Sequence, residues 1–301
     1  MTKQYDFVLL TESRYEYPDQ VDWYVKNILT EDGLVQAALE KRGMRCLRID
    51  WNRPDFDFSQ ARACLFRTTW DYFNLYDRFQ QWLEVVKGQT TLYNSAALVQ
   101  WNMDKHYLRD LSDKGVRIPP TSFMEPGDFR TLRDVHRELG WSDTVLKPAV
   151  SGAGRHTYRL DPGSLAEVEE TYRGLIQREA MLLQPFQHDV VKSGELALMV
   201  IDGAVTHAVR KVAKAGDFRV QDDFGGTVEP HEPTREEIAF AEKAIAACPE
   251  TPLYARVDMI RDNDGELALA ELELIEPEMW FREHPMAAER LAEALIRVQG
   301  A

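Results

Sequence analysis

The feature that most constrains this chain is a two-stranded pattern near its carboxyl end, PLYARVDMIRDNDGELALAELELIEP, at residues 252–277. Apolar and polar side chains alternate on both sides of Asp264-Gly265, a pair of residues that favours a two-residue type I′ hairpin loop. With that loop Asn263 pairs with Glu266, and every residue farther along the ribbon acquires a predicted partner. The chain is therefore expected to fold around an antiparallel hairpin whose register the sequence specifies.

Four charged residues fall on one face of the predicted hairpin. Counting outward from the loop sets Asp258 opposite Glu271 and Arg256 opposite Glu273, and side chains two positions apart on a strand point the same way. Three carboxylates then stand within about 5 to 8 Å of one another and repel, unless a proton or a cation neutralises them. A solvated strand face with an ion pair between Arg256 and Glu273 explains the same pattern equally well. Along the second strand this face is expected to change from apolar to acidic, in the order Leu267, Leu269, Glu271 and Glu273.

The residue types on this face also favour particular metal ions. Oxygen ligands with no His or Cys nearby favour Mg²⁺ or Mn²⁺ over zinc. If the face binds metal, we expect Asp258, Glu271 and Glu273 to be the ligands.

The first hundred residues alternate short strands with longer helical patterns. Strands are predicted at 5–10, 44–50 and 63–70, and apolar residues at helical spacing predict helices over 20–43 and 77–87. Such alternation indicates βαβ crossovers, a parallel sheet and an α/β fold.

Ligands of parallel sheets bind beyond the carboxyl ends of the strands. Residues that follow the first and third predicted strands therefore become candidates for contact with a small-molecule substrate, although solvated loop residues explain them equally well. These candidates are Thr11, Glu12, Ser13, Arg67, Thr68 and Asp71.

The rest of the chain predicts two further lobes of mixed α+β structure. A helix at 102–115 ends at a glycine, and strand patterns with hairpin signals follow it. No sequence repeat or low-complexity linker separates the lobes, so we expect them to share one cleft. The predicted organisation is an N-terminal α/β substrate lobe at 1–95, a central lobe at 96–185 and a C-terminal lobe at 186–301.

A glycine-containing segment at 145–158, VLKPAVSGAGRHTY, predicts a flap over an anion. Lys147 precedes the glycines, so the segment is not a P-loop, and Gly152 and Gly154 lack the third glycine of a dinucleotide fingerprint. A strand, a turn of small residues that includes Ser151 and a second strand can cover phosphates with backbone NH groups, while Lys147 reaches beneath. A plain β-turn is the alternative for the two glycines alone.

Neighbouring residues add to the prediction of a nucleotide site. Lys105 lies on the preceding helix, and an apolar strand ends in Gln184, Pro185 and Phe186, whose main chain and flat side chain suit a base. Glu195 begins the next strand and is placed to accept hydrogen bonds from ribose hydroxyls. Taken singly, these residues are more often a surface charge, a core aromatic and a solvated carboxylate.

Composition limits the classes of partner. The net charge of −14 argues against a broad nucleic-acid surface, which needs accumulated Lys and Arg. No apolar run approaches the roughly 20 residues needed to span a bilayer, so we expect no membrane partner and a cytoplasmic location. The three cysteines, Cys46, Cys64 and Cys248, are widely spaced and are expected to pack as reduced side chains.

A set of motifs in chain order resembles the ATP-grasp superfamily over about residues 95 to 285. The motifs are Lys105, VLKP with SGAGR, LLQPF, GELALMVIDG, RVD and ELELIEP. The chain is most similar to the branch that contains prokaryotic glutathione synthetase, D-alanine-D-alanine ligase and D-cycloserine synthetase. The segments RTTWDYF, HAVRKVAKAGDFRVQ and ELELIEP resemble the D-cycloserine synthetase group in particular.

The resemblance implies an ATP-grasp fold and an ATP-dependent ligase. Such a ligase makes an acyl phosphate and then a carbon–nitrogen bond, and when both reacting groups belong to one molecule the bond closes a ring. The resemblance implies that Lys105 and Lys147 hold phosphates under the loop from Ser151 to Arg155, and that Arg256 steadies transferred charge. It also implies adenine against Gln184, Pro185 and Phe186, ribose at Glu195, and two Mg²⁺ ions on Asp258, Glu271 and Glu273.

The substrate side follows the family less closely. Glu273 stands where many relatives have Asn, and IEPEMW replaces the SPG that often follows the metal strand. Arg210, Lys211 and Arg219 are candidates to guide a carboxylate or phosphate, and Gly225-Gly226 marks a loop that can exclude water. Two other readings remain open, a phosphotransferase at the same nucleotide site and a nucleotide-binding regulator without turnover. A homodimer is a further expectation, since such ligases often form dimers.

Overall fold

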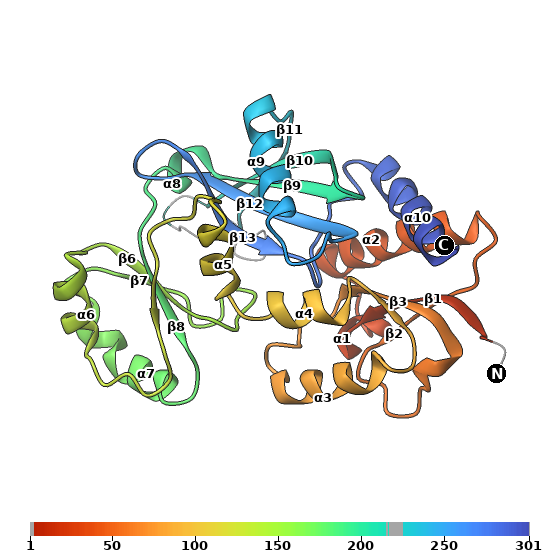
Figure 1. Ribbon diagram of the computed structural model, residues 1–301, viewed down its shortest axis with the longest axis horizontal. Coiled ribbons are helices and arrows are strands. Elements are labelled where there is room, and N and C mark those ends of the chain that lie inside the picture. Colours follow the sequence, from red (N-terminus) through yellow and green to blue (C-terminus); the bar gives the residue numbers. More distant parts are fainter. Residues whose placement is uncertain (1–2, 215, 217–224, 301) are drawn as a thin grey trace.

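The structure is a computed structural model that describes residues 3–214, 216 and 225–300. The described residues form three sheets, and Figure 1 shows them in three lobes, with the N-terminal lobe in red and orange, the central lobe in yellow and green, and the C-terminal lobe in cyan and blue. In the part of the chain that the structure describes, no helix has the length and apolar content that crossing a membrane requires.

The N-terminal lobe contains a parallel four-stranded sheet of order β2-β1-β3-β4, as the alternating pattern predicts. Strand β1 is buried on both faces: Phe7 and Leu9 belong to the core beneath α2 and α10, whereas Val8 and Leu10 pack with aromatic residues on the other side. The elements are β1 (Tyr5–Thr11), α1 (Ser13–Glu16), α2 (Trp23–Glu40), β2 (Cys46–Asp50), η1 (Phe58–Gln60), β3 (Ala61–Thr68), α3 (Tyr76–Val86) and β4 (Thr91–Tyr93).

The central lobe begins with two short helices and contains an antiparallel sheet of order β5-β8-β6-β7. Helices α6 and α7 cover one face of this sheet, where Leu146 and Leu183 meet Val135 and Tyr172. The elements are α4 (Ala96–Asn102), α5 (Tyr107–Asp113), β5 (Ser122–Met124), α6 (Leu132–Leu139), β6 (Thr144–Pro148), β7 (Tyr158–Leu160), α7 (Leu165–Ile176) and β8 (Met181–Pro185).

The C-terminal lobe contains a five-stranded antiparallel sheet of order β11-β10-β9-β12-β13. Helix α9 covers one face of the sheet, and α10 returns to pack beside α2 of the N-terminal lobe (Figure 1). The elements are α8 (Val190–Ser193), β9 (Glu195–Ile201), β10 (Ala204–Val212), β11 (Thr227–His231), α9 (Arg235–Ala246), β12 (Tyr254–Arg261), β13 (Leu267–Glu273) and α10 (Pro285–Gly300).

The loop of the last hairpin differs from its prediction. It runs from Asn263 to Gly265, one residue longer than the predicted loop, and Gly265 takes a left-handed conformation with φ of +85°. Such a loop combines a turn with a glycine that L side chains would strain. Arg261 consequently pairs with Leu267, one position away from the predicted register.

A bulge in β13 then restores the predicted register. Met259 pairs with Leu269 while Asp258 pairs with Glu271, so Ala270 is the extra residue on its strand. The predicted pairing of Asp258 with Glu271 is therefore confirmed, as is that of Arg256 with Glu273.

The bulge also reverses which face the side chains of β13 occupy. Leu267 and Leu269 pack under α9 together with Leu272, whereas Glu271 and Glu273 line the opposite side. The expectation of one face running from Leu267 to Glu273 is wrong, because an extra residue shifts the two-residue alternation by one.

Buried amide side chains connect the N-terminal and central lobes to the last hairpin. Asn94 Nδ2 donates to the carbonyls of Tyr254 at 2.9 Å and Leu274 at 2.7 Å, and Leu253 N donates to Asn94 Oδ1 at 2.7 Å. Asn102 makes a similar pair of bonds with the backbone of β13 and the residue after it. These bonds fix the position of the hairpin relative to α4.

Substitution of Asn94 tests this connection. Asn94→Leu leaves three buried backbone groups without partners, and we expect the free energy of unfolding to fall by about 3 kcal/mol in urea titrations. Gln100→Ala, at an exposed position on α4, is the control and is expected to change stability by less than about 0.5 kcal/mol. Equal effects of the two substitutions would contradict a structural role for Asn94.

Candidate active site

A cavity of about 700 Å³ is lined by residues of all three lobes. Most of the residues singled out from the sequence line it, although they come from six different strands and three loops. These residues are Lys105, Lys147, Ser151, Gly152, Gly154, Gln184, Pro185, Phe186, Glu195, Lys211, Arg256, Asp258, Glu271 and Glu273.

Three carboxylates form the acidic side of the cavity. One oxygen atom from each of Asp258, Glu271 and Glu273 lies within 4.8 Å of the others, an arrangement that can hold a divalent cation. Burial raises the pKa of Glu273 to about 8, and the charges of Asp258 and Glu271 act in the same direction. The cluster supplies hard oxygen donors only, which suits Mg²⁺ or Mn²⁺.

Two buried cations balance the charge of Asp258. Arg256 donates to both oxygens, with Nε 2.8 Å from Oδ1 and Nη2 2.8 Å from Oδ2, and Lys211 Nζ lies 2.9 Å from Oδ2. Burial alone would raise the pKa of Asp258, but Arg256 and Lys211 hold it below its ordinary value. Arg256 also pairs with Glu273, and Lys211 with Glu195.

Two lysines from the central lobe face Glu271. Lys105 Nζ lies 3.0 Å from Glu271 Oε1 and donates to the carbonyl of Ser151 at 2.5 Å. Lys147 makes no ion pair within 4.0 Å with any carboxylate that the structure describes, and burial lowers its pKa. Its positive charge is therefore the least compensated in the described part of the site, which favours a bound anion.

The predicted flap lies between β6 and β7 and reaches the N-terminal lobe. Residues Ala153, Gly154 and His156 have φ of +49°, +67° and +48°, so the segment turns tightly. A Cβ atom on Gly152 would stand 2.6 Å from Cε1 of Phe73, so only glycine permits this approach. The flap thus closes one side of the cavity against the N-terminal lobe.

The end of β8 forms the far wall. Phe186 is 3% exposed, and the guanidinium carbon of Arg159 lies 3.6 Å from the centroid of its ring. Gln184 Nε2 donates to Thr121 Oγ1 at 2.9 Å. Glu195, at the start of β9, also lines the cavity, and its pairing with Lys211 means that a ribose hydroxyl there would share the carboxylate with a cation.

Comparisons with known proteins agree with this arrangement. Residues 7–94 match the family model of the D-cycloserine synthetase DcsG N-terminal domain, and residues 117–270 match that of the prokaryotic glutathione synthetase ATP-grasp domain. The chain is 32% identical over 266 residues to the cycloserine biosynthesis protein DcsG of Streptomyces lavendulae, covering 82% of this chain and 86% of the relative. The chain belongs to the ATP-grasp ligases.

Other relatives agree on the family. This ATP-grasp chain is 25% identical over 243 residues to the glutathione synthetase of Agrobacterium fabrum, covering 78% of this chain and 73% of the relative. The crystal structure of D-cycloserine synthetase DcsG superposes with a TM-score of 0.83 at 26% identity, covering 97% of this chain and 99% of the other. The predicted ATP-grasp fold, a parallel sheet followed by two antiparallel α+β lobes, is thereby confirmed.

Of the described cations predicted to guide substrate, Lys211 lines the cavity and Arg210 does not. Arg210 precedes Lys211 on β10, so its side chain points to the opposite face, where Nη2 lies 3.3 Å from Nδ1 of His231. Arg219 lies outside the described residues. Only Lys211 of the three is observed in the ATP-grasp site.

The predicted substrate residues of the N-terminal lobe do not line the cavity either. Arg67 is 1% exposed and binds Asp32 of α2 through Nε at 3.3 Å, and Thr68 shares the same carboxylate at 3.2 Å. Asp71 accepts from Trp51 Nε1 at 2.7 Å. Arg67 and Thr68 thus belong to a buried polar network around Asp32, and the half-buried Asp71 is paired with Trp51.

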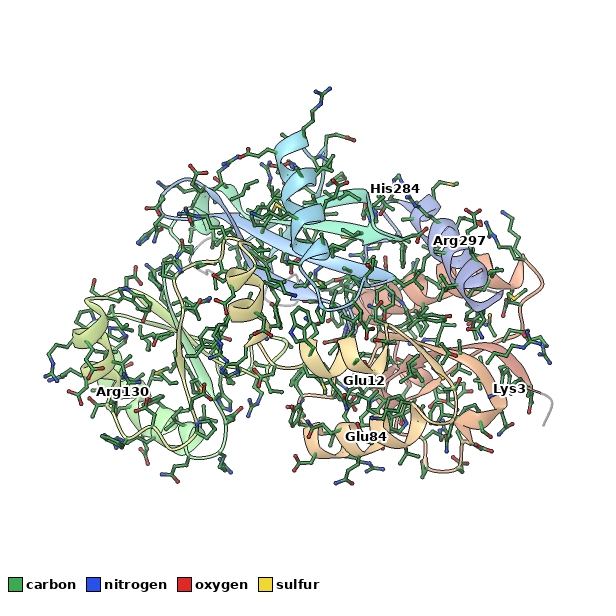
Figure 2. The ribbon with its side chains drawn as sticks, in the orientation of Figure 1. Lys3, Glu12, Glu84, Arg130, His284 and Arg297 are labelled. Atoms are coloured by element: carbon green, nitrogen blue, oxygen red, sulfur yellow. The ribbon has the colours of Figure 1, made fainter. Side chains whose placement is uncertain are left out.

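Glu12 is the fourth of these candidates and is fully buried (Figure 2). Arg14 Nη2 lies 2.5 Å from Oε1 and forms an ion pair with it, and no other described residue donates a hydrogen bond to either carboxylate oxygen. Burial raises the pKa of Glu12 to about 7, Arg14 opposes the rise, and Asp71 adds to it.

Sequence reasoning missed the wall that the N-terminal lobe contributes. The signal was the density of aromatic residues in RTTWDYF, since Trp70, Tyr72 and Phe73 of this segment line the wall. Glu276 and Glu278, which follow β13, also line the cavity. The aromatic and cationic members of this wall are Arg14, Tyr15, Tyr24, Trp70, Tyr72 and Phe73.

The raised pKa of Glu12 makes stability depend on pH. Between the ordinary value of 4.5 and about 7 the folded chain holds a proton that the unfolded chain releases, so stability falls as pH rises through this window. We expect Glu12→Gln to be about 2 to 3 kcal/mol more stable than wild type at pH 8 and nearly equal to it at pH 4, by urea unfolding.

The control for this prediction is Glu242→Gln, at an exposed position on α9. It is expected to leave the pH dependence of unfolding unchanged. A wild-type pH profile in Glu12→Gln would show that Glu12 has an ordinary pKa.

Proposed function

We propose that the protein is an ATP- and Mg²⁺-dependent carboxylate–amine ligase that forms an amide bond on a small amino-acid derivative. We further propose that the carboxylate and the amine can belong to one molecule, so that ligation closes a ring, as the name of the relative D-cycloserine synthetase suggests for that protein. The proposal rests on one observation. The carboxylates of Asp258, Glu271 and Glu273 line the same cavity as the ammonium groups of Lys105 and Lys147.

The carboxylate cluster suits the metal ions that the proposal requires. Its oxygens are close enough to share a cation, and no described His or Cys stands among them. Mg²⁺ bound there would supply positive charge against the triphosphate, and Mn²⁺ has the same ligand preference. We assign Asp258, Glu271 and Glu273 to this role.

The remaining residues of the site position the reactants. Lys105 and Lys147 neutralise phosphate oxygens, and the backbone from Ser151 to Arg155 covers them. Arg256 and Lys211 stabilise charge on the phosphoryl group as it moves to the substrate carboxylate. The amine then attacks the acyl phosphate, loses a proton and releases inorganic phosphate, while the closed cavity excludes water.

The position of Glu276 in the cavity favours a substrate that carries an amine. Glu276 lines the cavity and makes no ion pair with any cation that the structure describes, whereas Glu278 pairs with Arg282. Trp70 Nε1 donates to the backbone oxygen of Glu276 at 2.8 Å, so the residue is held in place. Burial and the charge of Glu273 raise the pKa of Glu276, so a protonated amine bound beside it would supply the positive charge that favours the carboxylate form.

Product analysis tests the proposed reaction. The protein is incubated with ATP, Mg²⁺ and a panel of amino acids and amines, and phosphate release is measured together with product mass. Phosphate release that needs both a carboxylate and an amine, with a product lighter by water, supports ligation. A stable phosphorylated product would indicate a phosphotransferase, and ATP binding without turnover would indicate a regulator.

Glu271→Gln tests the assignment of the carboxylate cluster. The substitution removes one negative charge from the cluster and the partner of Lys105, and we expect turnover to fall by at least about 100-fold. Circular dichroism and urea unfolding should show a retained fold. Turnover at the wild-type rate would refute the role of this residue.

Glu276→Gln tests the proposed amine site. We expect KM for an amine-bearing acid to rise about tenfold or more, because a charge-assisted bond is lost, while KM for ATP stays unchanged. The analogue in which a hydroxyl replaces the amine should show no such difference between wild type and variant. Glu283→Gln, at an exposed position, is the control, and a changed Mg²⁺ requirement would instead assign Glu276 to the metal.

A further inference from the structure

Trp280 contacts both buried cations of the site without lining the cavity itself. The centroid of its ring lies 5.2 Å from Cζ of Arg256 and 6.0 Å from Nζ of Lys211. The side chain is 3% exposed and lies in the core shared by the C-terminal sheet, α2 and α10. The two cations are thus held between the cavity and an aromatic ring.

The backbone of Trp280 is fixed in an unusual conformation. Its φ is +45°, a region that residues with a Cβ rarely adopt. Met279 O accepts from His207 Nε2 at 2.8 Å, and the next residue, Phe281, donates from N to Glu31 Oε2 at 2.9 Å. A strained residue held on both sides, by β10 and by α2, indicates a constraint beyond local folding.

The ring also carries a cost that a simple core side chain would avoid. Trp280 Nε1 is buried and has no hydrogen-bond partner among the described residues. An unpaired buried NH group is unfavourable, and Leu or Phe would fill space without it. The electron-rich face of the ring toward two cations distinguishes Trp from Leu, and this face is larger and attracts cations more strongly in Trp than in Phe.

The carboxylates that hold these cations are the same groups that we assign to metal. Arg256 is bound by Asp258 and Glu273, and Lys211 by Asp258 and Glu195. Metal ions on Asp258 and Glu273 would compete for oxygens that now accept from Arg256 and Lys211. The ring of Trp280 is a partner for which metal ions do not compete.

We propose that Trp280 is a positioning residue that holds Arg256 and Lys211 in place when metal and nucleotide occupy the site. This inference rests on the proposed function, because it needs metal ions on Asp258 and Glu273. In the metal-free state the carboxylates already fix both cations, so loss of the ring should matter little there. In the loaded state Glu195 can still pair with Lys211, and the ring becomes the main fixed partner of Arg256 and a second fixed partner of Lys211.

Phe281 provides a matched control for the role of a buried ring. It is fully buried in the same core, and Cζ of Arg67 lies 5.3 Å from its centroid. Arg67 does not line the cavity, so its ring contact has no part in the site. Phe281→Leu therefore removes a buried ring and a cation contact without touching the cations that face nucleotide.

The experiment compares wild type, Trp280→Phe, Trp280→Leu and Phe281→Leu. The probe is the non-hydrolysable ATP analogue AMP-PNP, whose affinity is measured by calorimetry with and without saturating Mg²⁺. For Trp280→Leu we expect about 10- to 30-fold weaker binding with Mg²⁺ and less than about threefold weaker binding without it. Trp280→Phe, which keeps a ring, and Phe281→Leu should stay within about threefold of wild type under both conditions.

Unfolding in urea separates this role from general destabilisation. Trp280→Leu and Phe281→Leu should lose similar stability in the absence of ligands, since both remove a buried ring. If Trp280→Leu does not fold, Trp280→Met replaces it in the same comparison.

The outcomes distinguish the inference from the proposed function. Wild-type protein that fails to bind AMP-PNP with Mg²⁺ would overturn the proposed function and this inference with it. Wild-type binding together with an equal loss in Trp280→Phe and Trp280→Leu, or a loss in Trp280→Leu that does not depend on Mg²⁺, would overturn only the role of Trp280.

Discussion

The rest of the structure depends on the balance of buried charge at the last hairpin. Asp258, Glu271 and Glu273 repel one another, and burial of such groups is unfavourable unless cations and hydrogen bonds compensate them. Arg256, on the hairpin itself, compensates part of this charge. The other cations come from elsewhere: Lys105 from the segment between α4 and α5, and Lys211 from β10. The site therefore exists only when the central and C-terminal lobes pack together, which makes the cavity a property of the whole chain.

The ion pairs at this site also indicate how the protein tolerates the charges before ligands bind. Arg256 and Lys211 compensate the negative charge of Asp258, which bound metal ions would otherwise neutralise. Lys105 compensates the charge of Glu271 in the same way. Lys147 has no such partner among the described carboxylates, and burial lowers its pKa. The cavity thus combines a preformed acidic side with a cation that a phosphate group can satisfy.

Much of the fold could be predicted from the sequence, because the spacing of apolar residues and the turn residues determine the structure of neighbouring positions. Alternating strands and helices predicted the parallel sheet, and the hairpin predicted the pairing of Asp258 with Glu271. That pairing is correct although the loop has one more residue than predicted, since Ala270 adds one residue to the other strand and restores the register. The faces predicted for the side chains of Leu267 and Leu269 were wrong for the same reason, because the alternation of apolar and polar residues does not reveal a bulge.

The sequence by itself determined the chemistry of the site: the carboxylates, the lysines and the glycines at spacings that suit phosphate and metal. Only the tertiary structure decided which charges face the cavity. Arg210 and Lys211 are adjacent and both basic, yet one points toward α9 and the other toward Asp258, because the orientation of β10 in its sheet sets the alternation. Arg67 likewise points to Asp32, since burial in the N-terminal lobe gave it a partner that lies 35 positions away in sequence. Contacts between distant segments, such as that of Trp280 with Arg256, depend on packing that no local pattern specifies.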